Sequence, residues 1–71
     1  MTDQELIQAA VSASGLSARR FAERVMSRDE RTIRRWISGE MPIPDVARRW
    51  LVWFVELSAP MQARLVVILD R

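Results

Sequence analysis

Residues that favour the beginning or the end of a helix occur close together along this chain and divide it into short segments. Thr2 and Glu5 have the T-x-x-E spacing of a capping box, and Gly15 is suited to end the helix that begins there. We therefore predict a helix at about residues 3–14. Helices this short are marginal alone and need packing against one another, which favours a compact bundle.

The next two helices are separated by only three or four residues. Ser17 is a suitable N-cap for a helix at about 18–25. A third helix ends at Gly39 and has two possible caps: Ser27, which begins a second capping box, and Asp29, which we favour.

Prolines mark the start of the C-terminal third. A fourth helix is predicted to begin at or just after Pro44 and to run to about Leu57. Ser58 can cap a fifth, although 65–69 is β-branched enough to form a strand instead. Because everything before it is helical, we favour a helix. The predicted fold is all-α, a compact four- to five-helix bundle in a single domain of residues 1–71.

Residue types that are absent narrow the function. The 71 residues include no cysteine and no histidine, which removes disulfides, the common soft metal ligands and catalysis by those side chains. Two glycines cannot form a phosphate-binding loop, and the carboxylates are scattered, so we expect no enzyme, no cofactor and no small-molecule ligand. The polar start MTDQELIQ and the lack of a membrane-length apolar run predict a cytoplasmic protein.

Positive charge is concentrated in one segment. Residues 17–36 hold seven arginines against three acidic residues, which leaves +4, although the whole chain carries only +2. Such a cluster is typical of surfaces that meet phosphate, but a solvated helix surface accounts for it equally well.

The third helix has two different faces. Ile33, Trp36 and Ile37 form its apolar stripe, so Trp36 is predicted to pack in the core rather than to stack on a base. Arg31 and Arg35 lie on the opposite stripe, and arginine is well suited to bind guanine in the major groove. Ser38 and Arg28 extend this stripe, and Glu30 and Arg34 flank it.

These features together resemble a known family. Residues 16–44 are similar to the lambda-repressor-like (Cro-type, XRE) helix-turn-helix DNA-binding domains, in the Ser17 cap, Phe21-Ala22, Val25, the run from Arg31 to Trp36, and Gly39. The resemblance implies that the second and third helices form the helix-turn-helix. Ala22 to Ile33 is eleven steps where the family usually has ten, so we expect one extra residue in the turn and a register open by one residue.

The resemblance, together with the arginine stripe on the third helix, predicts which residues contact DNA. The predicted base-reading residues are Glu30, Arg31, Arg34 and Arg35. The predicted phosphate contacts are Ser17, Arg19, Arg20, Arg28, Thr32 and Ser38.

The segment from Trp50 to Val55 in the fourth helix is apolar nearly all round, and with the apolar run at 65–69 it predicts that residues 45–71 also serve as a dimerisation region. The predicted interface residues are Trp50, Trp53, Phe54, Leu65, Ile68 and Leu69. The expected function is a homodimeric regulator of transcription that binds an inverted-repeat operator in double-stranded DNA, with repression of a phage or mobile-element operon as the default. The alternative is a protein-interaction module whose arginine face binds no DNA.

Overall fold

The computed structural model describes residues 1–71 and contains five α-helices and no strand. Their bounds are α1 (Asp3–Ser14), α2 (Ala18–Arg20), α3 (Glu30–Ser38), α4 (Asp45–Glu56) and α5 (Ala59–Leu69), and α2 continues directly into a π-helical segment, η1 (Phe21–Met26). The predictions of an all-α bundle and of a helix at 65–69 are confirmed.

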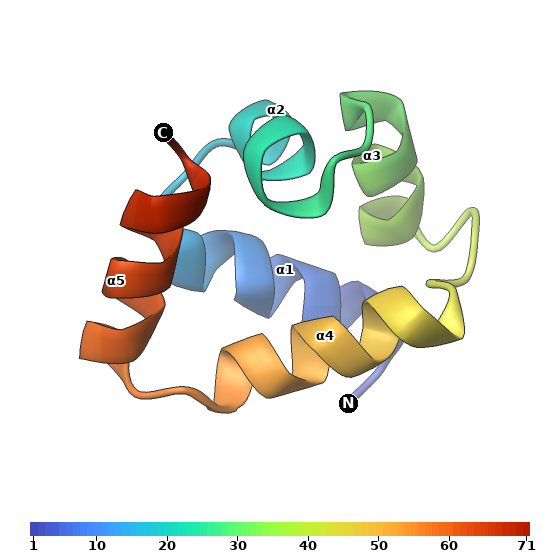
Figure 1. Ribbon diagram of the computed structural model, residues 1–71. Coiled ribbons are helices and arrows are strands. Elements are labelled where there is room, and N and C mark those ends of the chain that lie inside the picture. The colour runs from blue at the N-terminus through green and yellow to red at the C-terminus, as the bar shows by residue number, and fades with distance from the viewer.

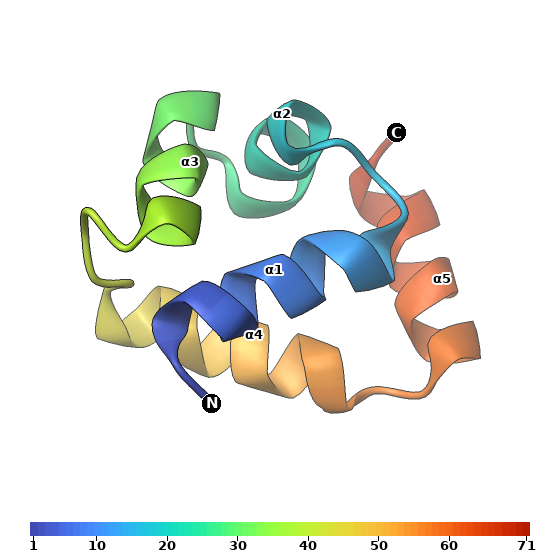
Figure 2. The same cartoon turned by 180° about the vertical axis from the view of Figure 1, so that it is seen from behind.

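Helix α1 lies in the middle of the bundle. In both views α2 and α3 lie on one side of α1, α4 lies on the opposite side, and α5 closes one end (Figures 1 and 2). Helix α1 contacts α3, α4 and α5. None of the helices is both long enough and apolar enough to cross a membrane.

The caps explain where the helices begin and end. The backbone N–H of Glu5 donates to Thr2 Oγ1 at 3.1 Å, and the Glu5 carboxylate accepts from the backbone N–H of Thr2 at 2.9 Å. Gly15 and Gly39 end α1 and α3 with φ of 72° and 82°, in the left-handed region that glycine tolerates. The predicted bounds of the first helix and the predicted glycine stops are confirmed.

Helix α3 begins at the cap that we favoured. Asp29 Oδ1 accepts from the backbone N–H of Thr32 at 2.9 Å and from its hydroxyl at 3.2 Å. Ser27 is not the cap, because it lies before the extended residue that starts the helix and has a left-handed backbone, with φ of 54°.

The second helix widens into a π-helical turn before it ends. The Ala22 carbonyl accepts from the backbone N–H of Ser27, five residues on, and of Arg28, six residues on, the latter at 2.9 Å. A π-helical turn holds one residue more than an α-helical turn, so η1 lengthens the second helix by one residue. The extra residue in the turn was counted against the family pattern and stays a prediction.

A small core fixes α3 against α1. Fully or almost fully buried apolar side chains come from every helical segment except the three-residue α2, and from Ile43 in the loop before α4. They are Leu6, Ile7, Ala10, Phe21, Ala22, Ile33, Trp36, Ile43, Ala47, Leu51, Phe54 and Val66. Trp36 has no exposed surface, so its predicted place in the core is confirmed.

Phe54 corrects part of the predicted dimer interface. Its side chain has no exposed surface, and its ring stacks on Trp50 with centroids 5.2 Å apart and packs against Phe21 at 6.5 Å. Phe54 is therefore a core residue of the chain itself. The error arose because α4 is apolar on more than one side, and its sequence does not mark which side faces α1.

Candidate nucleic-acid interface

Seven arginines form one exposed basic surface, which runs over α2, η1, the turn and α3. They are Arg19, Arg20, Arg24, Arg28, Arg31, Arg34 and Arg35. The short turn at residues 27–29 brings the two helical segments together, and α2 contacts α3 directly. The surface is therefore continuous across two elements.

Helix α3 is held with its arginine face outward. Ile33 and Trp36 are buried and Ile37 is half-buried, whereas Arg31, Arg34 and Arg35 are exposed. The Arg31 side chain forms no hydrogen bond and no ion pair within the chain. Its guanidinium keeps all five donors free for a partner outside the chain.

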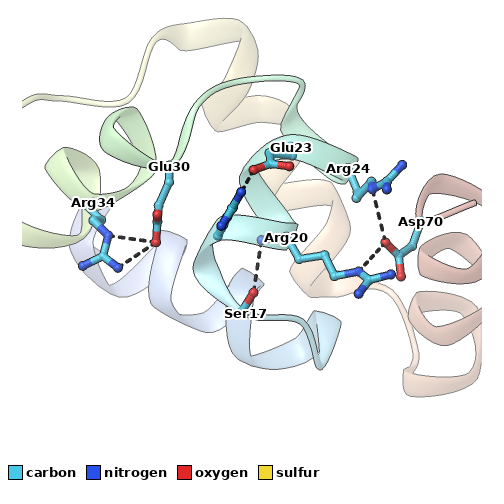
Figure 3. Close-up of polar contacts among 8 residues, drawn as sticks. Ser17, Arg20, Glu23, Arg24, Glu30, Arg34 and Asp70 are labelled. Carbon is cyan, nitrogen blue, oxygen red and sulfur yellow. Dashed lines mark hydrogen bonds and ion pairs between the residues drawn. The ribbon is translucent and has the colours of Figure 1, made fainter.

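Glu30 and Arg34, both predicted to read bases, are paired with each other. Arg34 Nε and Nη2 donate to Glu30 Oε2 at 3.0 and 2.6 Å, one turn apart on α3 (Figure 3). The Arg34 side chain is still 69% exposed. Exposed pairs of this kind contribute only about 0 to 1 kcal/mol, so a phosphate or a guanine can replace Glu30 as the acceptor for Arg34.

Two further arginines lie near the ends of α3: Arg28 precedes the helix and Arg35 is in its last turn. The Arg28 guanidinium lies over the Trp36 ring, 5.3 Å from its centroid, and covers the outer side of that core residue. Arg35 Nε lies 3.6 Å from Glu40 Oε2, just beyond the end of the helix. Arg28 is thus partly committed to the fold, and Arg35 has an exposed acid as its neighbour.

The start of the second helix carries the first predicted phosphate contacts. Ser17 Oγ accepts from the backbone N–H of Arg20 at 3.1 Å and caps the helix (Figure 3). Arg19 Nε donates to Glu23 at 2.9 Å, and this hydrogen bond raises the pKa of Arg19 above its ordinary value. Ser17 and Arg19 therefore both have hydrogen-bond partners within the second helix.

Asp70 links the C-terminus of the chain to this surface. Arg20 Nε donates to Asp70 Oδ1 at 2.9 Å, and Arg24 Nε lies 3.8 Å from the same oxygen (Figure 3). The Arg71 carbonyl accepts from Arg24 at 3.3 Å. The sequence does not predict this contact, because no local pattern relates residues fifty positions apart.

The two predicted hydroxyl contacts on α3 have partners within the chain. The Thr32 hydroxyl donates to Asp29, and hydrogen bonds from the Thr32 backbone and side chain lower the pKa of Asp29. The Ser38 hydroxyl donates to the Arg35 carbonyl at 3.1 Å and accepts from the backbone N–H of Glu40. Both hydroxyls stabilise the ends of α3. To donate to a phosphate, each hydroxyl would first have to give up the acceptor that it already has within the chain.

Hollows on the basic surface are polar and open. One of about 320 Å³ is lined by Ser17, Arg19, Arg20, Glu23 and Arg24. A second of about 500 Å³ at the start of α3 is lined by Asp29, Glu30, Arg31 and Arg34. Neither has an apolar wall, so they suit a charged, extended ligand better than a small apolar molecule.

The predicted dimer-interface residues other than Phe54 lie on α4 and α5, outside the basic surface. Trp53 and Ile68 are 48% and 57% exposed, whereas Trp50, Leu65 and Leu69 are half-buried. Trp53 and Ile68 line an open groove of about 380 Å³ between α4 and α5.

Comparisons of the chain with models of known families, with curated proteins and with solved structures found no match.

Proposed function

We propose that the chain binds double-stranded DNA through the basic surface, as a homodimeric regulator of transcription. The observation that carries the proposal is the exposed arginine face of α3, which is opposite the buried side chains of Ile33 and Trp36. A rigid helix with such a face has the size and charge to enter the major groove.

Arg31 and Arg35 are the base-reading candidates with most freedom. The Arg31 side chain has no partner in the chain, and the acid paired with Arg35 is the exposed Glu40. A guanidinium can donate two hydrogen bonds to O6 and N7 of one guanine, and such a contact contributes about 1 to 3 kcal/mol of discrimination. Arg34 joins them when DNA displaces Glu30.

Arg19 and Arg20 suit phosphate rather than bases. They extend from the first turn of the second helix, whose backbone N–H groups also favour an anion. Arg19 pairs with Glu23 and Arg20 pairs with Asp70. Surface ion pairs of this kind are weak, so a phosphate can take the place of the carboxylate. Phosphate contacts position a protein on DNA without reading sequence.

Two copies of the chain would recognise an inverted repeat, with their α3 helices in successive major grooves about 34 Å apart. A dimer bound at a promoter excludes polymerase, so repression is the default mode. The regulated operon of a phage or mobile element is part of this proposal and rests on the family resemblance alone.

Mobility shift of labelled DNA duplexes tests the proposal. We expect Arg31→Ala and Arg35→Ala to weaken binding about 5- to 150-fold on the preferred sequence and much less on random duplex. Arg19→Ala is expected to weaken binding equally on all sequences and to lower the slope of log K against log salt by about 0.9 for each phosphate that it no longer neutralises. Arg64→Ala removes an exposed arginine on α5 and is the matched control. If the arginine variants on α3 bind like the control, the basic surface does not bind DNA.

A second candidate function is supported by the exposed apolar side chains of α4 and α5. Trp53, Met61 and Ile68 are about half exposed, which is unusual for a single small chain and favours a protein partner. In that case the arginines keep the protein soluble, and the wild-type chain shows no mobility shift at low salt.

A further inference from the structure

Helix α4 has an exposed face that carries both signs of charge around apolar side chains. Ala47, Leu51 and Phe54 face the core. The opposite face carries Arg49, Val52, Trp53 and Glu56. Since seven residues make nearly two full turns, Arg49 and Glu56 point in directions only about 20° apart. Val52 and Trp53 lie between them along the helix, 40% and 48% exposed.

Neither charge has a partner within the chain. The side chains of Arg49 and Glu56 form no hydrogen bond and no ion pair, whereas six other arginines and five other acidic residues form ion pairs. Glu56 is also the last residue of α4, where the helix dipole disfavours a negative charge. The face is therefore half apolar and carries two exposed charges that form no ion pair within the chain.

We infer that this face is the contact for a second copy of the chain, in which the two α4 helices pack antiparallel. The two-fold axis passes between Val52 and Trp53, because antiparallel pairing about that point sets Arg49 against Glu56 of the second copy, twice. It also sets Val52 beside Val52 and Trp53 beside Trp53 of the second copy, on the two sides of the charged line. A two-fold interface uses the same patch on both copies and so needs a patch that complements itself, which this one does.

Parallel packing of the same face is disfavoured by the same charges. It would bring Arg49 against Arg49 and Glu56 against Glu56, so two attractions would become two repulsions. The charges thus select the orientation, which is the usual contribution of ion pairs at an interface.

The exposed face of α5 lacks this complementarity. Val67 and Ile68 are exposed there, 64% and 57%, but the charged side chains beside them are Arg64 and Arg71. Antiparallel pairing of two α5 helices would set arginine against arginine. The contact between copies is therefore on α4 and not on the α5 residues predicted from the sequence.

The proposed contact is separate from the basic surface. Both views show α4 across α1 from α2 and α3 (Figures 1 and 2). A second copy on α4 leaves Arg31 and its neighbours exposed. This contact would supply the homodimer of the proposed function with its interface, but it does not depend on DNA binding.

Sedimentation of the full chain without DNA, over about 1 to 100 μM, tests the inference. We expect the wild type to form dimers, and Arg49→Glu or Glu56→Arg alone to weaken dimerisation about 10- to 30-fold, because both pairs become repulsive. The double variant Arg49→Glu/Glu56→Arg restores the pairs and is expected to dimerise like the wild type.

A mixture of the two single variants gives the sharpest result. In a mixed dimer, glutamates at 49 and 56 of one copy meet arginines at 56 and 49 of the other, so mixing is expected to restore dimers that neither variant forms alone. Arg64→Glu on α5 is the control and is expected to leave dimerisation unchanged. Circular dichroism checks that each variant is folded.

Three results would overturn the inference. They are a wild-type chain that stays monomeric at about 100 μM, a mixture that associates no better than its components, and an Arg64→Glu variant as weak as Arg49→Glu. None of these results tests DNA binding. The mobility shift with Arg31→Ala tests the basic surface, which lies on the other side of α1 from α4.

Discussion

Replacing Phe54 by alanine tests whether this residue belongs to the core, as the structure shows, or to the dimer interface, as the sequence predicts. The ring is fully buried between Trp50 and Phe21. Truncation of a buried phenylalanine costs about 3 to 5 kcal/mol, from the burial that is removed and from the cavity left behind. A 71-residue chain has a total stability of roughly 4 to 11 kcal/mol, so Phe54→Ala removes a large share of it.

Thermal unfolding followed by circular dichroism at low micromolar concentration measures this loss. At about 4 to 8 °C per kcal/mol, the midpoint of Phe54→Ala is expected to fall by at least roughly 12 °C. Trp53→Ala is the control, since Trp53 is 48% exposed and its replacement is expected to weaken self-association more than folding. A Phe54→Ala midpoint within a few degrees of the wild type, with self-association abolished, would refute the assignment of Phe54 to the core.

Three other sets of substitutions test the local structure. Ser27→Gly is expected to stabilise the chain by about 1 kcal/mol in urea unfolding, because Ser27 has a left-handed backbone and glycine has no Cβ to strain it. Gly15→Ala and Gly39→Ala are each expected to cost about 1 to 2 kcal/mol. The two losses should be similar, because a Cβ at Gly39 would meet only the movable end of the exposed Gln4 side chain, 2.8 Å from its Nε2, and nothing lies within 4 Å at Gly15; a much larger loss at Gly39 would contradict this. The pKa of Asp29 is lowered in the folded chain, so its contribution to stability is fully present above pH 3.8 and is lost as the pH falls through the lowered pKa. Asp29→Asn keeps an acceptor that does not titrate, and its unfolding midpoint is expected to fall less between about pH 5 and pH 2 than that of the wild type.

Local signals in the sequence carried most of the secondary structure. Thr2, Ser17, Asp29 and the glycines at 15 and 39 act through hydrogen bonds and backbone angles within a few residues of themselves. Such effects are decided locally, so their positions can be predicted from the chain alone.

The place of the π-helical turn could not be predicted from local signals. The count of residues between Ala22 and Ile33 indicated an insertion, but no glycine or proline marks where it lies. Phe21 and Ala22, at the start of the wider turn, are both fully buried in the core, a tertiary contact that local signals do not show.

Interactions between distant residues were also missed. Asp3 accepts from the backbone N–H of Ile43 at 2.9 Å and pairs with Arg48, and Asp70 holds Arg20. The stripe of Arg49 and Glu56 could have been found, since opposite charges seven residues apart share a helix face. It was missed because an all-round apolar helix does not indicate which of its sides faces the core.

Selection of bound duplexes from a randomised DNA pool tests the central claim most directly. We predict that the wild-type chain enriches an inverted repeat, and that Arg31→Ala loses the preference at one position in each half-site while Arg64→Ala keeps it. If the wild type enriches no sequence, or if Arg31→Ala enriches the same repeat with the same strength, the face of α3 does not read DNA.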